Sequence, residues 1–322
     1  MRILAFLAAA VLSSAATAQA QGLEWPNKPV KLLIPWAPGG SSDSLGRILS
    51  VKLTEQLGQA VVIENKPGAT GTIGHAIVAR AAADGYTLLF ASNSTFSIAS
   101  HLYKDLSYDD VKSFAPVSWA GFNAQILSVH PSMPVRNFPE LIAMAKARPG
   151  EINFSTAGVG STSHLATELL MAMAGVKMTH VPYKGGDPSL QALLAGETKM
   201  SFVDISSAVP HAAAGRLRPL ATSTARRISQ MPDLPTIAES GLPGFESMTA
   251  FAMFAPAGTP QAIIDRLARE IDRALAADDV KRILAVQGVE PVGGAPSKLA
   301  EFQKADSAKW GRVIQERGIK FE

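Results

Sequence analysis

Short apolar segments typical of buried strands alternate with segments of helical spacing along most of this chain of 322 residues. Residues 30–34, 61–63 and 87–91 are such apolar runs, and each leads into a loop that contains glycine or hydroxyl side chains. Helical patterns follow the first two runs, from about Leu45 and Ile73. Repeated strand–helix units with short connections predict parallel sheets flanked by helices, so we expect an α/β fold.

The pattern starts again after a connection that contains proline and aromatic residues. The second set of expected strands comprises residues 125–129, 152–155, 178–181, 199–204 and 217–221. An apolar segment over 250–255, a long amphipathic helix over 263–275 and two more helices over 280–287 and 297–317 follow. Two sets of units fit two sheets better than one. We therefore expect two lobes, each a mostly parallel sheet flanked by helices.

The N-terminal segment has the order of features typical of an export signal. Arg2 precedes an apolar run over 3–12, and small residues then end in Ala18-Gln19-Ala20. We expect residues 1–20 to be a cleavable secretory signal peptide, with cleavage after Ala20. No later segment holds the roughly 18 consecutive apolar residues that a membrane-spanning helix needs, so we expect no membrane insertion of the mature chain.

Composition excludes several kinds of chemistry. The chain contains no cysteine, which rules out disulfides, thiolate catalysis and cysteine-ligated metals. The net charge is only +3 and the basic residues are scattered, so we expect no nucleic-acid partner. The six histidines show no spacing typical of a metal site, and we expect neither a metal nor a cofactor.

Two glycine-rich loops have an unusual lack of positive charge. Neither 32–46 nor 152–176 contains lysine or arginine, although the chain has 30 of them. Each loop leads from a strand into a helix, where ligands bind in parallel sheets. A helix N-terminus presents unpaired N–H groups and about half a positive charge, so it can hold an anion without a basic side chain. We interpret these loops, with 70–71 and 92–95 as further candidates, as a receptor for a carboxylate.

The same residues also have simpler structural roles. Serine or aspartate before a helix is often only a cap, and Ser42 or Asp43 is the expected cap of the first helix. Asp43 would repel an anion, so accepting loop N–H groups is its favoured role and ligand contact the alternative. Trp36 is either a core residue or a wall of the cavity. His164 begins a helix, which disfavours imidazolium, so a neutral hydrogen-bonded histidine is favoured over a catalytic base.

Enzyme motifs are missing. Residues 158–160 lack the third glycine of a dinucleotide-binding fingerprint, and residues 183–186 (YKGG) do not form a phosphate-binding loop. No Gly-x-Ser-x-Gly motif occurs, and no acid that would orient His164 beside Ser161 can be identified. We therefore expect no enzymatic activity.

Five motifs lie between residues 34 and 260. They are residues 34–43 (IPWAPGGSSD), 64–69 (ENKPGA), 84–88 (DGYTL), 180–185 (HVPYKG) and 254–260 (FAPAGTP). Together they resemble the substrate-binding proteins of tripartite tricarboxylate transporters, known as Bug receptors. The likeness extends from Trp25 to Trp310.

The resemblance implies a periplasmic binding protein of type II, in which the chain crosses twice between two lobes and encloses its ligand at the hinge. The crossings would fall near Phe122 and Thr222, which gives lobe 1 residues 21–122 and 223–322 and lobe 2 residues 123–222. The implied function is capture of a small carboxylate in the periplasm and its delivery to a membrane permease of one large and one small subunit. We expect the receptor to be a monomer. The alternatives are a ligand-presenting sensor for a signalling system and a secreted enzyme that acts on a small organic acid.

The resemblance places ligand contacts in residues 36–43 and 156–164, the two loops that the charge argument selects. The family often has asparagine where this chain has Val159, and an acid where it has Val203 followed by Asp204. Asp204 therefore either faces the cleft or caps a helix. The expected ligand-binding residues are Trp36, Ala37, Gly39, Gly40, Ser41, Ser42, Asp43, Thr70, Ser92, Thr95, Thr156, Gly160, Ser161, Thr162, Ser163, His164 and Asp204.

Overall fold

The computed structural model describes residues 25–319, so the expected signal peptide lies outside the described residues. The described strands form two sheets. The first sheet contains β1 (Val30–Ile34), β2 (Val61–Asn65), β3 (Thr87–Ser92), β4 (Phe114–Asn123), β10 (Thr249–Pro256) and β11 (Val289–Pro291). The second contains β5 (Gln125–Val129), β6 (Asn153–Thr156), β7 (Thr179–Pro182), β8 (Met200–Asp204) and β9 (Arg218–Thr222). The strand orders are β11-β4-β10-β3-β1-β2 and β7-β6-β8-β5-β9.

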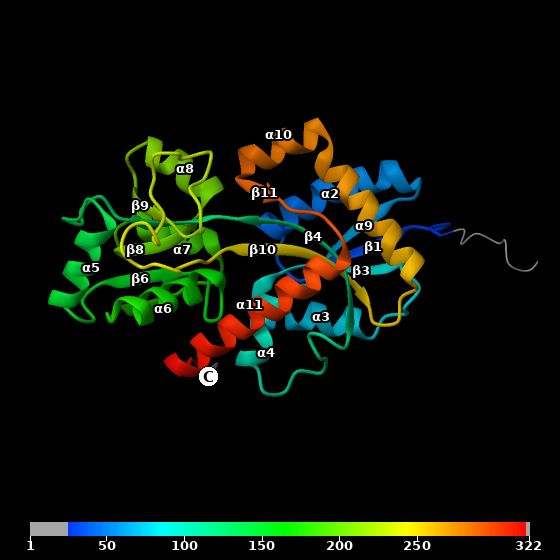
Figure 1. Ribbon diagram of the computed structural model, residues 1–322, viewed down its shortest axis with the longest axis horizontal. Coiled ribbons are helices and arrows are strands. Elements are labelled where there is room, and N and C mark those ends of the chain that lie inside the picture. The colour runs from blue at the N-terminus through cyan, green and yellow to red at the C-terminus, as the bar shows by residue number, and fades with distance from the viewer. Residues whose placement is uncertain (1–24, 320–322) are drawn as a thin grey trace, which may run out of the picture.

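Helices flank both sheets (Figure 1). With the first sheet lie α2 (Ser41–Leu57), η1 (Ala69–Gly71), α3 (Thr72–Ala79), η2 (Ser94–Ile98), α4 (Ala99–Leu102), α9 (Gln261–Ala276), α10 (Asp278–Gln287) and α11 (Pro296–Arg317). With the second lie α5 (Phe138–Ala147), α6 (Thr162–Ala174), α7 (Gly186–Leu194) and α8 (Ile205–Ala213). The expected two-lobed α/β architecture is confirmed.

The apolar run of β1 explains why this strand lies inside the first sheet. Leu32 and Leu33 point to opposite faces, and both are fully buried. Leu32 belongs to the core that α2 and α9 complete, and Leu33 to the core that includes residues of α3 and α11. Full burial of one leucine side chain contributes about 1.5–3 kcal/mol, so a strand covered on both faces is strongly favoured here.

Both sheets are mixed rather than mostly parallel. β1 pairs in parallel with β2 and β3, and β6 with β7 and β8. By contrast, β10 runs antiparallel to β3 and β4, and β5 runs antiparallel to β8 and β9. The parallel strands of each lobe end at the side that faces the other lobe. A strand that crosses from one lobe into the next starts at that side, so it must run in the opposite direction.

The chain passes from the first sheet to the second at Ala124, between β4 and β5. The expected crossing near Phe122 is two residues away. After β9 the chain does not return at once, because Ile228, Ile237 and Phe245 pack in the cores of the second sheet. β10 begins the return at Thr249. We therefore propose residues 25–123 and 249–319 as lobe 1 and 124–248 as lobe 2, instead of a boundary at residue 223.

Helix α11 lies across both lobes (Figure 1). Its Trp310 is fully buried in a cluster that includes Leu165 of α6. At its end, Arg317 Nε lies 2.9 Å from Glu168 Oε2 of α6. The lobes are therefore linked in three places: by the chain crossing from β4 to β5, by the return into β10, and by the packing of α11 against α6.

Candidate functional site

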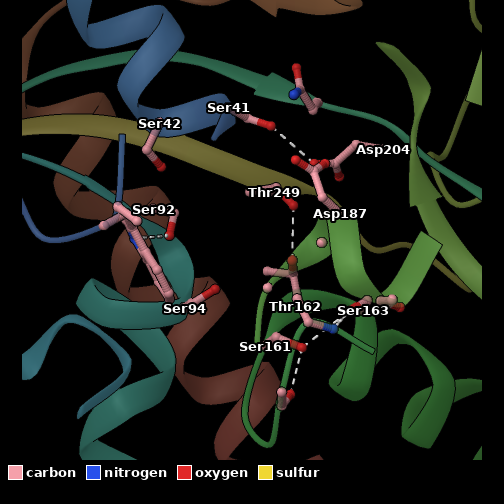
Figure 2. Close-up of a pocket in the computed structure, with 18 of the residues that line it drawn as sticks. Ser41, Ser42, Ser92, Ser94, Ser161, Thr162, Ser163, Asp187, Asp204 and Thr249 are labelled. Carbon is pink, nitrogen blue, oxygen red and sulfur yellow. Dashed lines mark hydrogen bonds between the residues drawn. The ribbon is translucent and has the colours of Figure 1, made fainter. Parts of the chain in front are cut away.

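A cavity of about 1130 Å³ lies between the two lobes. The loops after β1, β2 and β3 line it from one side, and the loops after β6, β7 and β8 line it from the other. These are the carboxyl ends of the parallel strands, where α/β sheets bind ligands. The crossing strands contribute Asn123, Gln125 and Thr249. The fold thus gathers six separate loops around one space. Figure 2 shows side chains from both lobes around it.

Most of the expected site residues line this cavity, and some do not. Those that line it are Trp36, Ala37, Gly39, Ser41, Ser42, Thr70, Ser92, Ser161, Thr162, Ser163 and Asp204. The expected residues that are not part of the cavity wall are Gly40, Asp43, Thr95, Thr156, Gly160 and His164.

The helix α2 has an open N-terminus at the cavity. Its N-cap is Gly40, and no side chain makes the capping hydrogen bond, so the expected cap by Ser42 or Asp43 is wrong. Ser44 N donates to Gly40 O, whereas the amides of Ser41, Ser42 and Asp43 have no acceptor among residues 25–319. These three N–H groups carry the positive end of the α2 dipole.

Asp43 holds the loop that precedes α2. Its side chain accepts hydrogen bonds from Gly39 N (3.0 Å), Arg47 Nε (2.8 Å) and Asn65 Nδ2 (2.9 Å), and the residue is only 2% exposed. Burial by itself raises the pKa of Asp43, but these hydrogen bonds outweigh burial and hold the pKa below its ordinary value. The loop-fixing role that we favoured for Asp43 is what the geometry shows. Arg47 balances its charge.

Two contacts place the remaining side chains of the β1 and β3 loops. Trp36 Nε1 donates to Ser92 Oγ over 3.1 Å, and the half-buried indole forms part of the cavity wall. Thr95 is fully buried and donates to Ser92 O over 2.7 Å, so its hydroxyl is used within the loop. The expected polar loop 92–95 continues into the helical turn η2, whose Ser94 also lines the cavity.

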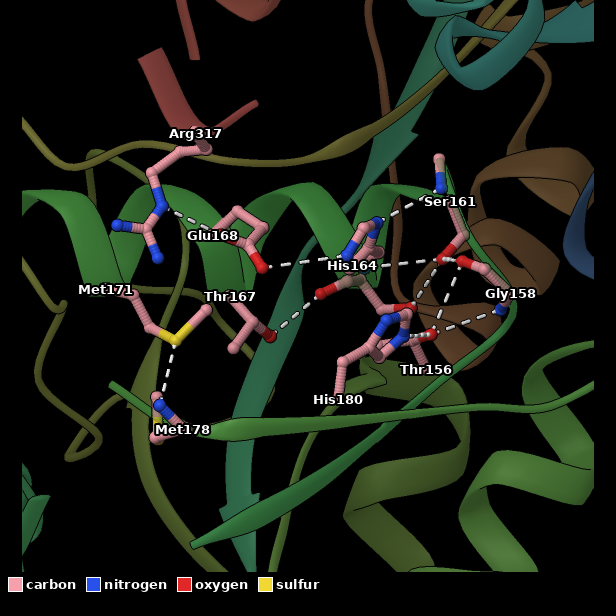
Figure 3. A network of polar contacts seen from close by, with 12 residues as sticks. Thr156, Gly158, Ser161, His164, Thr167, Glu168, Met171, Met178, His180 and Arg317 are labelled. Carbon is pink, nitrogen blue, oxygen red and sulfur yellow. Dashed lines mark hydrogen bonds and ion pairs between the residues drawn. The ribbon is translucent and has the colours of Figure 1, made fainter. Parts of the chain in front are cut away.

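The loop after β6 uses most of its own hydrogen-bonding groups (Figure 3). Ser161 is the N-cap of α6, with its Oγ accepting from His164 N and donating to Gly158 O over 2.7 Å. Ser163 Oγ accepts from Ala157 N over 3.1 Å. The amides of Thr162 and Ser163 have no acceptor within the described part of the chain. This loop therefore offers two N–H groups to the cavity from a rigid turn.

The buried His164 and the partly buried His180 support that turn from behind (Figure 3). The rings of His164 and His180 stack with centroids 4.1 Å apart. Gly160 N donates to His164 Nδ1 over 3.1 Å, and His180 Nε2 lies 2.7 Å from Thr156 Oγ1. Burial lowers the pKa of His164 to about 3 and that of His180 to about 4. Both rings are neutral at pH 7, as expected for His164, and they position the loop.

Further lining residues are absent from the set of expected ligand-binding residues, although Ser94 lies in the expected loop 92–95. They are Ser94, Asn123, Gln125, Tyr183, Lys184, Gly185, Asp187, Ser206, Ser207 and Thr249, among others. Thr162 Oγ1 and Thr249 Oγ1 lie 2.9 Å apart, which connects α6 to β10. The loop after β7 follows a parallel strand in the same way as the two selected loops, and that position is the signal that could have identified it.

The charged side chains on the described cavity wall are Lys184, Asp187 and Asp204. Lys184 is exposed and forms no ion pair with any described residue. Asp204 Oδ2 accepts from Ser41 Oγ of the other lobe over 3.0 Å. Burial raises the pKa of Asp204, and the nearby charge of Asp187 raises it further. The lack of lysine and arginine in the loops 32–46 and 152–176 thus extends, with the exception of Lys184, to the whole described cavity wall.

Within residues 25–319, no group of three or more histidine, aspartate or glutamate side chains lies close enough together to hold a metal ion. None of the helices in this range combines the length and the apolar composition that a membrane crossing requires.

Two α/β lobes, joined by crossing strands around a cleft that is lined by helix N-termini, define a solute-binding protein of the periplasmic binding type. Residues 45–319 match the family described as "Tripartite tricarboxylate transporter family receptor", TctC, and the chain belongs to that family. This family consists of transport receptors and not of enzymes. The resemblance to Bug receptors is therefore confirmed.

Relatives match over nearly the full chain. BugT of Bordetella pertussis is 35% identical, over 100% of this chain and 99% of BugT. A protein encoded in the tcbD-tcbE intergenic region of Pseudomonas sp. strain P51 is 38% identical, over 98% of this chain and 94% of that protein.

Solved structures agree with this placement. An R. palustris protein solved with adipate has a TM-score of 0.85 and 36% identity, and covers 92% of this chain and 100% of its own. MatC from Rhodopseudomonas palustris with bound malate has a TM-score of 0.81 and 32% identity, with 90% and 100% covered.

Proposed function

We propose that this protein is a periplasmic receptor that captures a small carboxylate between its lobes and delivers it to a membrane permease of one large and one small subunit. The proposal includes export by residues 1–20 and action as a monomer. One observation carries it: helix N-termini from both lobes present unpaired amides to a single cavity whose described wall has one lysine and no arginine. The adipate and malate named with two related structures support a small carboxylate as the ligand here.

The expected contacts explain how an anion binds without a basic partner. The amides of Ser41 and Ser42 would donate from lobe 1, and those of Thr162 and Ser163 from lobe 2. Each charge-assisted hydrogen bond contributes about 1.5–3 kcal/mol. About five such bonds are needed to reach the roughly −8 kcal/mol of micromolar binding after the cost of association. Four amides and the hydroxyls of Ser92 and Ser94 are six donors, which is enough.

Enclosure of the ligand requires donors from both lobes at once. We propose that an open form binds the anion on one lobe and that closure brings the second set of amides onto it. The bonds from Ser41 to Asp204 and from Thr162 to Thr249 join the loops that meet in the closed form. No bond of the ligand changes in this cycle.

A thermal-shift screen tests the proposal. The full mature chain is heated with mono-, di- and tricarboxylates, with aminocarboxylates, and with the uncharged amide of each as a matched control. A ligand that binds only the folded state at 100 times its Kd adds about 2.7 kcal/mol of stability, so the melting temperature must rise. We expect at least one carboxylate to raise it and its amide not to. If every carboxylate leaves the melting temperature unchanged, or if the amides act equally well, the receptor site is not the one proposed.

A further inference from the structure

One end of the cavity carries two carboxylates. Asp204 ends β8, and although it stands at the N-cap position of α8 its side chain makes no capping hydrogen bond. Its Oδ2 accepts from Ser41 Oγ, and its second oxygen has no partner among the described residues. Asp187, in the first turn of α7, points toward Asp204 from the neighbouring loop (Figure 2). No cation is paired with either carboxylate within residues 25–319.

A buried acceptor without a partner lies beside Asp204. Gln125 is the register partner of Asp204 in the β5–β8 pair, so both side chains project from the same face of the sheet. Gln125 Nε2 donates to Thr162 Oγ1, which leaves Oε1 without a donor although the residue is only 2% exposed. Asn123, 1% exposed, also lines the cavity and has an unpartnered Oδ1.

These groups share one chemical property: all of them accept hydrogen bonds. A buried acceptor left without a donor destabilises the folded protein, and two carboxylates that face each other without a cation repel. A ligand that places an ammonium group here would satisfy the acceptors and offset the repulsion. A second ligand carboxylate placed here would add to the repulsion.

We propose that Asp187, Asp204 and Gln125 form a subsite for an ammonium group, and that the ligand is an aminocarboxylate rather than an unsubstituted dicarboxylate. This inference rests on the proposed receptor function and narrows its ligand class. The carboxylate of the ligand meets the open helix N-termini, and its ammonium group meets the acceptor end. Asp187 is then a specificity-determining residue, since it supplies the second negative charge.

Isothermal titration calorimetry on the mature chain tests this subsite. The titrants are 4-aminobutanoate, 5-aminopentanoate and 6-aminohexanoate, each against the dicarboxylate and the hydroxycarboxylate of equal carbon number at pH 7.5. We expect the best aminocarboxylate to bind at least tenfold more tightly than its dicarboxylate and its hydroxycarboxylate counterparts. A preference for the dicarboxylate, or equal affinity for the hydroxy compound, overturns the inference and leaves the receptor function intact. Absence of binding by all three classes would instead count against the receptor function.

Variants assign the preference to the subsite. Asp187 is exposed and makes no hydrogen bond to any described group, so Asp187→Asn should fold normally. We expect Asp187→Asn to shift the affinity ratio of aminocarboxylate to dicarboxylate at least tenfold toward the dicarboxylate, and Asp204→Asn to shift it in the same direction. Asp105→Asn, an exposed aspartate outside the cavity wall, removes the same charge and should leave the ratio unchanged. An unchanged ratio in Asp187→Asn, with an unchanged melting temperature, contradicts the proposal.

Discussion

Replacement of Asp43 by alanine tests how the β1 loop is held. The side chain is 2% exposed and accepts from Gly39 N, Asn65 Nδ2 and Arg47. A hydrogen bond to a charged group contributes about 1.5–3 kcal/mol, so loss of the bonds from Gly39 and Asn65 should cost about 3–6 kcal/mol. Gly39 is exposed and water can replace the carboxylate there, which favours the lower end. Arg47 adds little, because its side chain is 54% exposed.

The expected result for Asp43→Ala is therefore a loss of about 3 kcal/mol in the free energy of unfolding, measured by urea denaturation at pH 7. Arg47→Gln is the matched control, since it removes only the exposed partner and should cost much less than Asp43→Ala. Because the loop also sets the direction of the open α2 amides, Asp43→Ala should weaken carboxylate binding in calorimetry by more than the control does.

The pH dependence provides an independent check of the same contact. The pKa of Asp43 is lowered in the folded protein, so its contribution to stability is present above the ordinary carboxyl pKa of about 3.9 and is lost as the pH falls through the lowered value. The stability difference between wild type and Asp43→Ala should thus narrow below pH 4. If Asp43→Ala unfolds within 1 kcal/mol of wild type at pH 7, or if Arg47→Gln costs as much, the assignment of Asp43 as the group that holds the loop is refuted.

Three other predictions concern closure and the loop after β6. A Cβ at Gly288 would lie 2.0 Å from Ile205 Cγ2 of the other lobe, and Gly288 has a φ of +65°. Gly288→Ala should therefore disfavour closure of the lobes. In small-angle scattering with ligand, this variant should show a larger radius of gyration than the wild-type protein. The pKa of His164 is lowered to about 3, so folding requires the neutral ring. The wild-type protein should therefore lose stability as the pH falls from about 6.5 to 4, as measured by urea denaturation. His164→Gln should lose less stability over that range. Arg317→Gln removes a partly exposed ion pair to Glu168 and should cost at most about 1 kcal/mol by the same assay.

Local sequence patterns predicted the strand–helix units well. The expected bounds of β1 and β5 agree with the structure residue for residue, because a strand buried on both faces is mostly apolar. Strand direction is not encoded in such runs. An antiparallel crossing strand and a parallel interior strand have the same composition. The mixed sheets could therefore not be predicted without knowing how the chain passes between the lobes. The same holds for the cavity residues Asn123, Gln125 and Thr249, which lie on the crossing strands.

The loop after β6 shows why a correct loop does not identify each contact residue. Thr156, Gly160 and His164 lie in a stretch that the charge pattern selected, yet their polar groups bond within the loop and behind it. A hydroxyl near an unpaired N–H is satisfied locally before any ligand arrives, because the partner is already at hand. Composition therefore predicts that a loop is polar and rigid. It does not predict which donors remain for a ligand.

The loop after β7 shows the converse, because a motif search set it aside for lacking a phosphate-binding pattern. The missing phosphate-binding pattern argues only against a phosphate ligand. It says nothing about whether the loop lies at the cavity. Its position at the carboxyl end of a parallel strand, next to the loop after β6, places Asp187 in the cavity. Had all such strand ends been treated alike, the facing carboxylates Asp187 and Asp204 would have followed from topology. We therefore propose a charge pattern with two parts: unpaired amides that attract an anion, and facing acids that limit which anions fit.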